Sequence, residues 1–177
     1  TDVSVIEAAL KRYPGTAFVN SANLEDGGEK ARKIFALARE HGAFVVCLTI
    51  DEGGMARTVD RKIEVAGRMI DIACGEFGLP RERLVFDLLT FTLATGEKEF
   101  ADSAVCTIEA IKALKKKYYG VLTSLGVSNV SFGLAKEARR VVNASLLHHA
   151  VKAGLDMAIV NPSDLPEYSE LDDEERR

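Results

Sequence analysis

The sequence predicts an α/β fold built on a parallel sheet, and two observations support this class. Five short apolar segments begin near residues 17, 44, 84, 121 and 157, and a helical pattern separates each segment from the next. The segment over residues 43–50 is apolar at nearly every position, which is typical of a strand that helices cover on both faces. Regular alternation of this kind leaves two architectures open, a doubly wound open sheet and a (β/α)8 barrel.

The helices are predicted from apolar residues that recur at spacings of three and four. In the first helix Ile6 and Leu10 share one face, and Pro14 with Gly15 ends the pattern. Gly42 follows the second helix in the position that a left-handed C-cap requires. We therefore expect helices over residues 3–12, 29–41, 58–77, 101–118 and 139–153.

The strands are predicted from short apolar and β-branched runs that end in polar residues. We expect them over residues 16–20, 43–50, 84–87, 119–125 and 157–161. Neither a glycine-rich dinucleotide fingerprint nor a Walker A sequence follows any of these runs, which argues against a nucleotide-binding open sheet. The segment over residues 88–96 is expected to be an apolar, threonine-rich loop.

A polar side chain stands at the end of every expected strand. These residues are Asn20 with Ser21, Asp51 with Glu52, Asp87, Ser128 with Asn129, and Asn161. The carboxyl ends of parallel strands share one edge of the sheet, which is where such folds bind ligands. Helix N-caps also favour Asn, Asp and Ser, so capping remains the competing explanation for each residue.

The segment over residues 126–133, Gly-Val-Ser-Asn-Val-Ser-Phe-Gly, lies between the fourth expected strand and the last expected helix. Ser128, Asn129 and Ser131 each both donate and accept hydrogen bonds. Three such side chains framed by glycines suit a flat polar heterocycle at a strand end. An ordinary turn that uses Asn and Ser for its own backbone bonds is the alternative.

The composition is that of one globular domain, with 47% hydrophobic and 28% charged residues in 177. A net charge of -4 and the lack of a basic face argue against a nucleic-acid or anionic-membrane partner. Cys47, Cys74 and Cys106 lack metal-ligand spacing, so we expect buried thiols and no metal site. No signal peptide and no apolar run of membrane-spanning length is present, and a cytoplasmic location is expected.

Five segments carry a resemblance to a known family. They are residues 18–22 (FVNSA), 49–54 (TIDEGG), 85–87 (VFD), 126–133 (GVSNVSFG) and 157–162 (MAIVNP). In this order and spacing the chain resembles the pterin-binding family, and within it the folate modules of cobalamin-dependent methionine synthases. Methyltetrahydrofolate:corrinoid methyltransferases are similar, and dihydropteroate synthases are more distantly so.

The resemblance implies a (β/α)8 TIM barrel of pterin-binding type, of which about the last five strands are present. Residues 1–162 would form the C-terminal portion of this barrel, and the first strands would be supplied separately or by a longer chain. Residues 163–177 are acidic and resemble the linker toward a following cobalamin-binding module.

The function that the resemblance implies is binding of 5-methyltetrahydrofolate and support of methyl transfer from its N5 to cob(I)alamin carried by a partner module. This is one half-reaction of methionine synthesis from homocysteine. Two alternatives stay open: a stand-alone methyltetrahydrofolate:corrinoid protein methyltransferase, and a folate-binding module without chemistry. Dihydropteroate synthase is disfavoured, because Ser-Asn stands where that enzyme would need a lysine and arginine constellation.

The resemblance also assigns site residues. Asn129 would stand near N5 as the catalytic residue, and Asn20 and Asp87 would bind the pterin ring. Further substrate-binding residues would be the rim residues Asp51 and Asn161, the cation Arg139 near the pterin or the glutamyl tail, and Ser128 and Ser131, which would orient Asn129. The family's zinc belongs to another module, so no metal is expected here.

Overall fold

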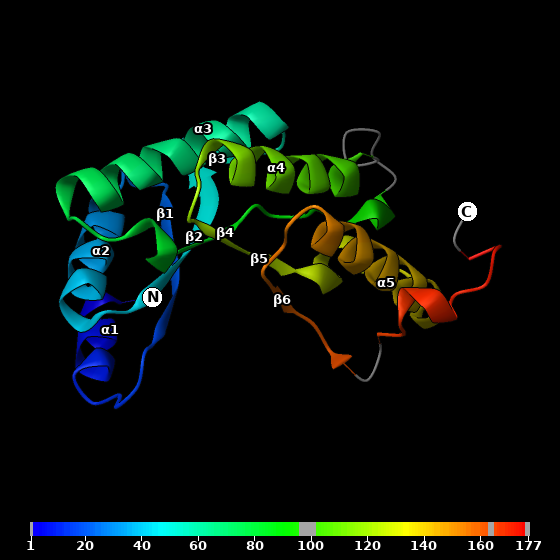
Figure 1. The fold of residues 1–177 in the computed structure, drawn as a ribbon, viewed down its shortest axis with the longest axis horizontal. Helices are drawn as coiled ribbons and strands as arrows, with labels where there is room; N and C mark the ends of the chain where they lie inside the picture. Colours follow the sequence, from blue (N-terminus) through cyan, green and yellow to red (C-terminus); the bar gives the residue numbers. More distant parts are fainter. Residues whose placement is uncertain (1, 96–101, 163–164, 176–177) are drawn as a thin grey trace.

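The structure, a computed structural model, describes residues 2–95, 102–162 and 165–175. A parallel sheet runs through it with the strand order β1-β2-β4-β5-β6, and the short β3 pairs antiparallel with β2 (Figure 1). The strands are β1 (Phe18–Leu24), β2 (Phe44–Asp51), β3 (Gly54–Met55), β4 (Leu84–Asp87), β5 (Leu122–Gly126) and β6 (Met157–Ile159). Because the parallel strands follow chain order without the reversal of a doubly wound sheet, the fold is a partial (β/α)8 barrel.

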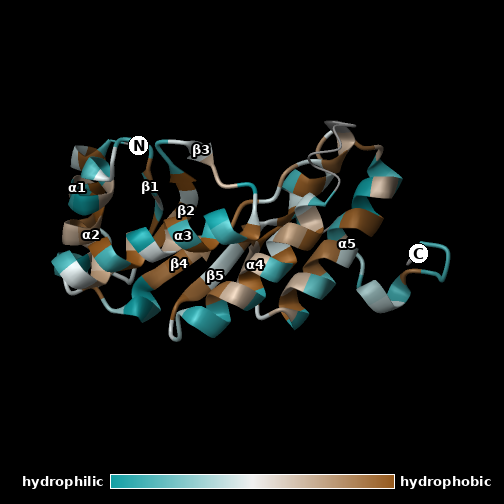
Figure 2. Ribbon diagram, turned by 90° about the horizontal axis from the view of Figure 1, so that it is seen from above, coloured by the Kyte–Doolittle hydropathy of each residue, from teal (hydrophilic) through white to brown (hydrophobic). Residues whose placement is uncertain are grey.

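Helices lie along the outer side of this curved sheet. They are α1 (Val3–Leu10), α2 (Glu29–His41), α3 (Val59–Ile70), α4 (Ser103–Lys117) and α5 (Lys136–Lys152). Short turns add a π-helical continuation of α3 at Asp71–Glu76 and 3-10 turns at Arg81–Arg83, Leu93–Thr95, Val127–Ser131 and Tyr168–Glu170. In Figure 1, α1 and α2 stand at one end of the sheet and α5 at the other, and Figure 2 shows the apolar strands β4 and β5 behind α3 and α4.

The helix α2 shows why these sequences form these elements. Ile34, Phe35 and Ala38 recur at helical spacing and are fully buried against the sheet. Gly42 adopts a φ of 65° and donates its backbone N–H to the carbonyl of Ala38, which ends the helix. The predicted bounds of this helix and of the strand over residues 84–87 are confirmed.

The prediction that residues 43–50 are buried on both faces was wrong. Along β2, fully buried Val45 and Cys47 alternate with half-buried Val46 and Leu48. The helices cover only the outer face, and the described strands form an arc with no wall opposite its inner face. A concave inner face is therefore available at the carboxyl ends of the strands.

The strand β1 extends further than predicted, because its pairing with β2 continues from Phe18 opposite Phe44 to Leu24 opposite Asp51. Asn20, expected at the strand's end, therefore lies within it. The helix predicted from residue 139 begins earlier, at Lys136, because the backbone N–H of Arg139 already bonds to the carbonyl of Ala135. The short strand β3 was not predicted.

The C-terminal tail packs against α5. The ring of Tyr168 stacks on that of His148 with 4.0 Å between centroids, and Leu171 is buried. This segment was expected to be an acidic linker toward a further module, and that expectation stays a prediction.

Candidate functional site

Asn20 and Asp87 lie on the inner face of the sheet. The pairing register sets Asn20 beside Val46 and Val46 beside Val85, while Asp87 lies beside Leu48. Side chains alternate along a strand, and laterally paired residues point to the same side. Asn20 from β1 and Asp87 from β4 therefore project into the same concave surface, with the half-buried aliphatic side chains of β2 between them.

Asp87 ends β4 and turns the chain. Its Oδ1 accepts a hydrogen bond from the backbone N–H of Leu89 at 2.9 Å, and the side chain is half-buried. Burial raises the pKa of Asp87 above the usual aspartate value, and the Leu89 bond and the nearby charge of Lys62 partly oppose this rise. Within the part of the chain that the structure describes, the other carboxylate oxygen of Asp87 accepts no hydrogen bond, so Asp87 can still accept from a ligand.

Lys62 supports this turn, and it was not among the predicted site residues. The side chain is 1% exposed, and its Nζ donates to the carbonyls of Leu88 and of Leu89, the latter at 2.7 Å. Burial lowers the pKa of Lys62 to about 8. Its signal in the sequence is a lysine placed four residues before Ala66, on the apolar side of a predicted helix.

Asn129 projects from a 3-10 turn that follows β5 directly. Its side chain is exposed, while Ser131 is fully buried and donates from Oγ to the carbonyl of Ser128 at 3.2 Å. A Cβ at Gly126 would lie 3.0 Å from Nδ2 of Asn129, so the glycine permits the present position of that carboxamide. Ser131 thus stabilises the turn, and the carboxamide of Asn129 is exposed; that the two serines orient Asn129 stays a prediction.

The loops that follow β4 and β5 are tied together. The hydroxyl of Thr92 donates to the carbonyl of Phe132 at 2.6 Å. Thr92 follows Asp87 by five positions in the sequence, and Phe132 follows Asn129 by three. Since β4 and β5 are neighbours in the sheet, this bond fixes the two predicted site segments against each other.

A separate pocket brings together three further predicted site residues, Ser128, Arg139 and Asn161. They line a pocket of about 360 Å³ between the turn after β5, the end of β6 and the first turns of α5. Its other lining residues are Leu134, Lys136 and Arg140. Arg139 is half-buried and Asn161 exposed, so this pocket presents cations and amide groups to solvent.

The side chain of Asp51 lies on the outer face of the sheet, opposite to Asn20 and Asp87. Three positions after the inner-face residue Leu48, it faces α3, where it is 1% exposed and forms ion pairs with Arg61 and with Arg68, the latter at 2.8 Å. The structure does not bring Asp51 together with Asn20 and Asp87. Its expected contact with a ligand stays a prediction.

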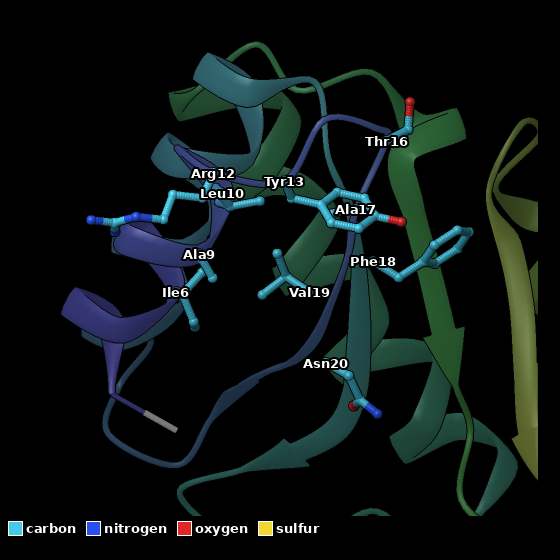
Figure 3. Close-up of a pocket in the computed structure, with 10 residues that line it drawn as sticks. All are labelled: Ile6, Ala9, Leu10, Arg12, Tyr13, Thr16, Ala17, Phe18, Val19 and Asn20. Carbon is cyan, nitrogen blue, oxygen red and sulfur yellow. The ribbon is translucent and has the colours of Figure 1, made fainter.

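A further cavity lies at the open edge of the sheet, between α1 and β1. It measures about 680 Å³ and is lined mainly by apolar groups (Figure 3). In Figure 3 the side chains of Ile6 and Val19 face the space between the helix and the strand, and Asn20 lies at its lower end. The ring of Phe18 stacks on that of Phe44 nearby, at 4.6 Å.

Within the described ranges, no group of three or more His, Cys, Asp and Glu side chains is arranged to hold a metal ion. In the same ranges, no helix has the length and hydropathy that crossing a bilayer requires. The polar groups on the inner face are carboxylates, carboxamides and hydroxyls. They can recognise a ligand through hydrogen bonds and place a donor at one of its atoms.

Comparison with known proteins agrees with this arrangement. The family model described as pterin binding enzyme matches residues 1–161. The chain is 44% identical over 180 residues to a protein of Mycobacterium leprae named methionine synthase, and 45% identical over 179 residues to its namesake in Mycobacterium tuberculosis. These alignments cover 100% and 99% of this chain but 15% of each relative, so the chain spans a small part of the proteins it matches.

A solved structure of similar fold is the dihydropteroate synthase of Yersinia pestis. It superposes with a TM-score of 0.50 at 12% identity, and the match covers 88% of this chain and 70% of that chain. At this identity the likeness concerns the fold alone. It agrees with the partial barrel deduced from the strand order.

Proposed function

This chain belongs to the pterin binding enzyme family, and on that basis we propose that it binds 5-methyltetrahydrofolate and supports methyl transfer from N5 to cob(I)alamin, in methionine synthesis from homocysteine. One observation carries the proposal. Asp87 and the turn bearing Asn129 follow neighbouring strands, and the bond from Thr92 to Phe132 joins their loops. A carboxylate and a carboxamide are thereby held at the same edge of the sheet.

The pterin ring is recognised by its pyrimidine edge. The 2-amino-4-oxo pyrimidine presents adjacent N–H donors, and a carboxylate accepts from such an edge in bidentate fashion. Asp87 supplies the carboxylate, and its half-buried position strengthens these bonds once water is displaced. Asn20, on the same face, provides a second polar contact from β1.

Methyl transfer from N5 is difficult because a tertiary amine is a poor leaving group. The methyl group passes to cob(I)alamin, and the electron pair of the broken bond stays on N5. N5 takes up one proton from water to give tetrahydrofolate, and a hydrogen bond to N5 stabilises the charge that develops there. In this proposal Asn129, which is exposed, donates a hydrogen bond from Nδ2 to N5, and a carboxamide does so without changing its own charge. The methyl acceptor, cob(I)alamin, is a substrate that a partner module brings to the exposed edge.

We also propose that further strands complete the barrel beside β1. That strand pairs with β2 on one side, and the apolar cavity between α1 and β1 lies along its other edge. An unpaired edge beside apolar surface favours pairing with another strand. Residues 1–162 then form one portion of the barrel, and residues 163–177 lead toward a cobalamin-binding module.

The test is calorimetric titration of 5-methyltetrahydrofolate into the chain and into a form extended at its N-terminus by three barrel strands. We expect binding by the extended form and about a tenfold or greater loss in Asp87→Ala and Asn129→Ala, since each removes a hydrogen bond worth about 1.5 kcal/mol or more to a polar ligand. Asp71→Ala, which removes an exposed carboxylate near the end of the outer helix α3, is the matched control.

The result against the proposal is an extended, folded protein that binds no 5-methyltetrahydrofolate. The polar strand ends would then serve as helix caps and turn formers. If the short chain alone fails to bind, the completion of the barrel is supported and the folate assignment stands.

A further inference from the structure

An exposed phenyl ring lies close to Asn129. Phe132 directly follows the 3-10 turn Val127–Ser131 that carries Asn129, and it is 72% exposed. Single exposed apolar side chains are common on protein surfaces and have no function by that fact alone. Phe132 differs from them by its place, because it lies on the loop between β5 and α5, at the edge of the sheet where the proposed methyl transfer occurs.

The backbone of Phe132 is held on both sides. Its N–H donates to the carbonyl of Asn129 at 3.3 Å, and its carbonyl accepts from the hydroxyl of Thr92 at 2.6 Å. At the next residue, Gly133, an added Cβ would lie 3.3 Å from the Cβ of Ala94 in the loop after β4. The two loops are therefore closely packed, and they present the phenyl ring in a defined place while leaving most of it in contact with solvent.

The strands that are proposed to complete the barrel do not cover this ring by pairing beside it. The strand before Phe132, β5, already pairs with β4 on one side and with β6 on the other. Additional strands must therefore pair elsewhere in the sheet. The partner that the proposed reaction brings to this edge is cob(I)alamin.

The shape of cob(I)alamin determines how much of the edge it covers. Its cobalt must come within bonding distance of the methyl group on N5, which the proposed function places beside Asn129. The corrin ring around the cobalt is much wider than the bond that forms, so it extends over the protein surface next to Asn129. Its rim bears methyl groups and methylene chains, and such groups pack favourably against an aromatic ring.

We propose that the side chain of Phe132 contacts the corrin ring of cob(I)alamin and holds it over the methyl group of the folate. The inference rests on the proposed function, because it requires methyl transfer at Asn129. Phe132 is then a binding residue for the methyl acceptor. The hydrogen bond between the backbones of Phe132 and Asn129 fixes the position of this contact relative to the group that faces N5.

The test measures methyl transfer from saturating 5-methyltetrahydrofolate to free cob(I)alamin by the extended protein, at several concentrations of cob(I)alamin. Phe132→Ala should lower kcat/KM for cob(I)alamin about tenfold, because most of the apolar contact of the ring is lost. Phe132→Leu keeps a large apolar side chain and should stay within about threefold of the unaltered protein. The loss in Phe132→Ala should persist at about 0.5 M salt, since salt screens charges and not apolar contacts.

Tyr119→Ala is the matched control. Tyr119 is also an exposed aromatic residue, at 89%, but it precedes β5 and so lies at the opposite end of that strand. Its removal should leave kcat/KM for cob(I)alamin unchanged. Melting temperatures establish that the variants fold, and calorimetry should give Phe132→Ala the same affinity for 5-methyltetrahydrofolate as the unaltered protein.

Three results count against the contact. An unchanged kcat/KM for cob(I)alamin in folded Phe132→Ala overturns it and leaves the proposed function intact. Weaker folate binding by this variant also overturns it, because the ring then covers the folate or supports Asn129 instead. An unaltered extended protein that binds the folate but methylates no cob(I)alamin overturns both the contact and the proposed methyl transfer.

Discussion

Lys62 lies against the turn that Asp87 begins, and burial acts on both groups in favour of their neutral forms. The lysine has hydrogen-bond partners in two backbone carbonyls, which is how a nearly inaccessible ammonium is retained in the structure. The hydroxyl of Thr107 donates to one of these carbonyls, that of Leu89, at 2.8 Å. The position of the Asp87 turn therefore depends on residues from α3 and α4, far from it in sequence.

Lys62→Met tests this support through the pH dependence of stability. The pKa of Lys62 is about 8 in the fold and about 10.5 in the unfolded chain, so the unfolded state binds more protons between these values. The free energy of unfolding of the unaltered protein should therefore rise across this window, by up to about 3 kcal/mol, relative to the variant. Urea unfolding of both proteins at pH 7.5 and pH 10 measures the difference.

The same variant should bind folate more weakly, because the Asp87 turn loses the donor that holds Leu88 and Leu89. Equal pH profiles of stability for the two proteins would contradict the lowered pKa of the buried Lys62. Unchanged folate affinity in a folded variant would contradict its support of Asp87.

At the scale of elements, the side chain of Asp156, just before β6, links the N-terminal ends of β5 and β6 through hydrogen bonds. Its carboxylate accepts from the backbone N–H and hydroxyl of Thr123 at 2.7 and 2.8 Å, and from Lys115 at 2.9 Å. Burial acts to raise the pKa of Asp156, but the bonds from Lys115 and Thr123 outweigh it and lower that pKa below the usual value. These two strands carry the turn with Asn129 and the pocket with Asn161, so the link positions the site from the opposite end of the strands.

Asp156→Asn should destabilise the protein at neutral pH by about 1 kcal/mol, since an ion pair and charge-assisted bonds are weakened. A carboxylate with a lowered pKa stabilises the fold above its unfolded pKa, near 4, and this contribution disappears as the pH falls through the folded value. The difference between the two proteins should therefore shrink below pH 4. Chemical unfolding from pH 7 to pH 3 measures it, and a constant difference would contradict the role of the charge.

Elements with strong local signals were predictable from sequence, and those that depend on partners were not. The helix over residues 29–41 has apolar periodicity and a C-cap glycine, and the strand over residues 84–87 is a short apolar run before a polar turn. By contrast, the continuation of β1 to Leu24 and the existence of β3 follow from pairing with β2. Such pairing is a tertiary interaction that local propensity does not encode.

The same distinction, between features with a local sequence signal and features that depend on tertiary partners, applies to the residues of the candidate site. Asp87 and Asn129 could be singled out because they follow strands directly, and both lie at the expected edge. Asp51 also follows a strand, but the twofold alternation of side chains turns it toward α3 and two arginines. Lys62 could not be assigned from sequence alone, because its partners are carbonyls from a distant loop.

For the whole molecule, strand order is the decisive property. The alternation of strands and helices left both an open sheet and a barrel possible, and the order β1-β2-β4-β5-β6 with a covered outer face distinguishes them. The inner face remains concave and bears Asn20 and Asp87, while the cationic pocket lies beside it at β6 and α5. In our account, the folate ring and its N5 lie along this one edge.

The most direct test of this account is methyl transfer itself. The extended protein is mixed with 5-methyltetrahydrofolate and free cob(I)alamin without oxygen, and the loss of cob(I)alamin absorbance is followed. We predict that methylcobalamin forms and that Asn129→Ala, at saturating folate, slows its formation about a hundredfold, as expected for removal of one donor at a developing charge. A folded protein that binds 5-methyltetrahydrofolate yet leaves cob(I)alamin unmethylated would contradict the account and identify a binding module without chemistry.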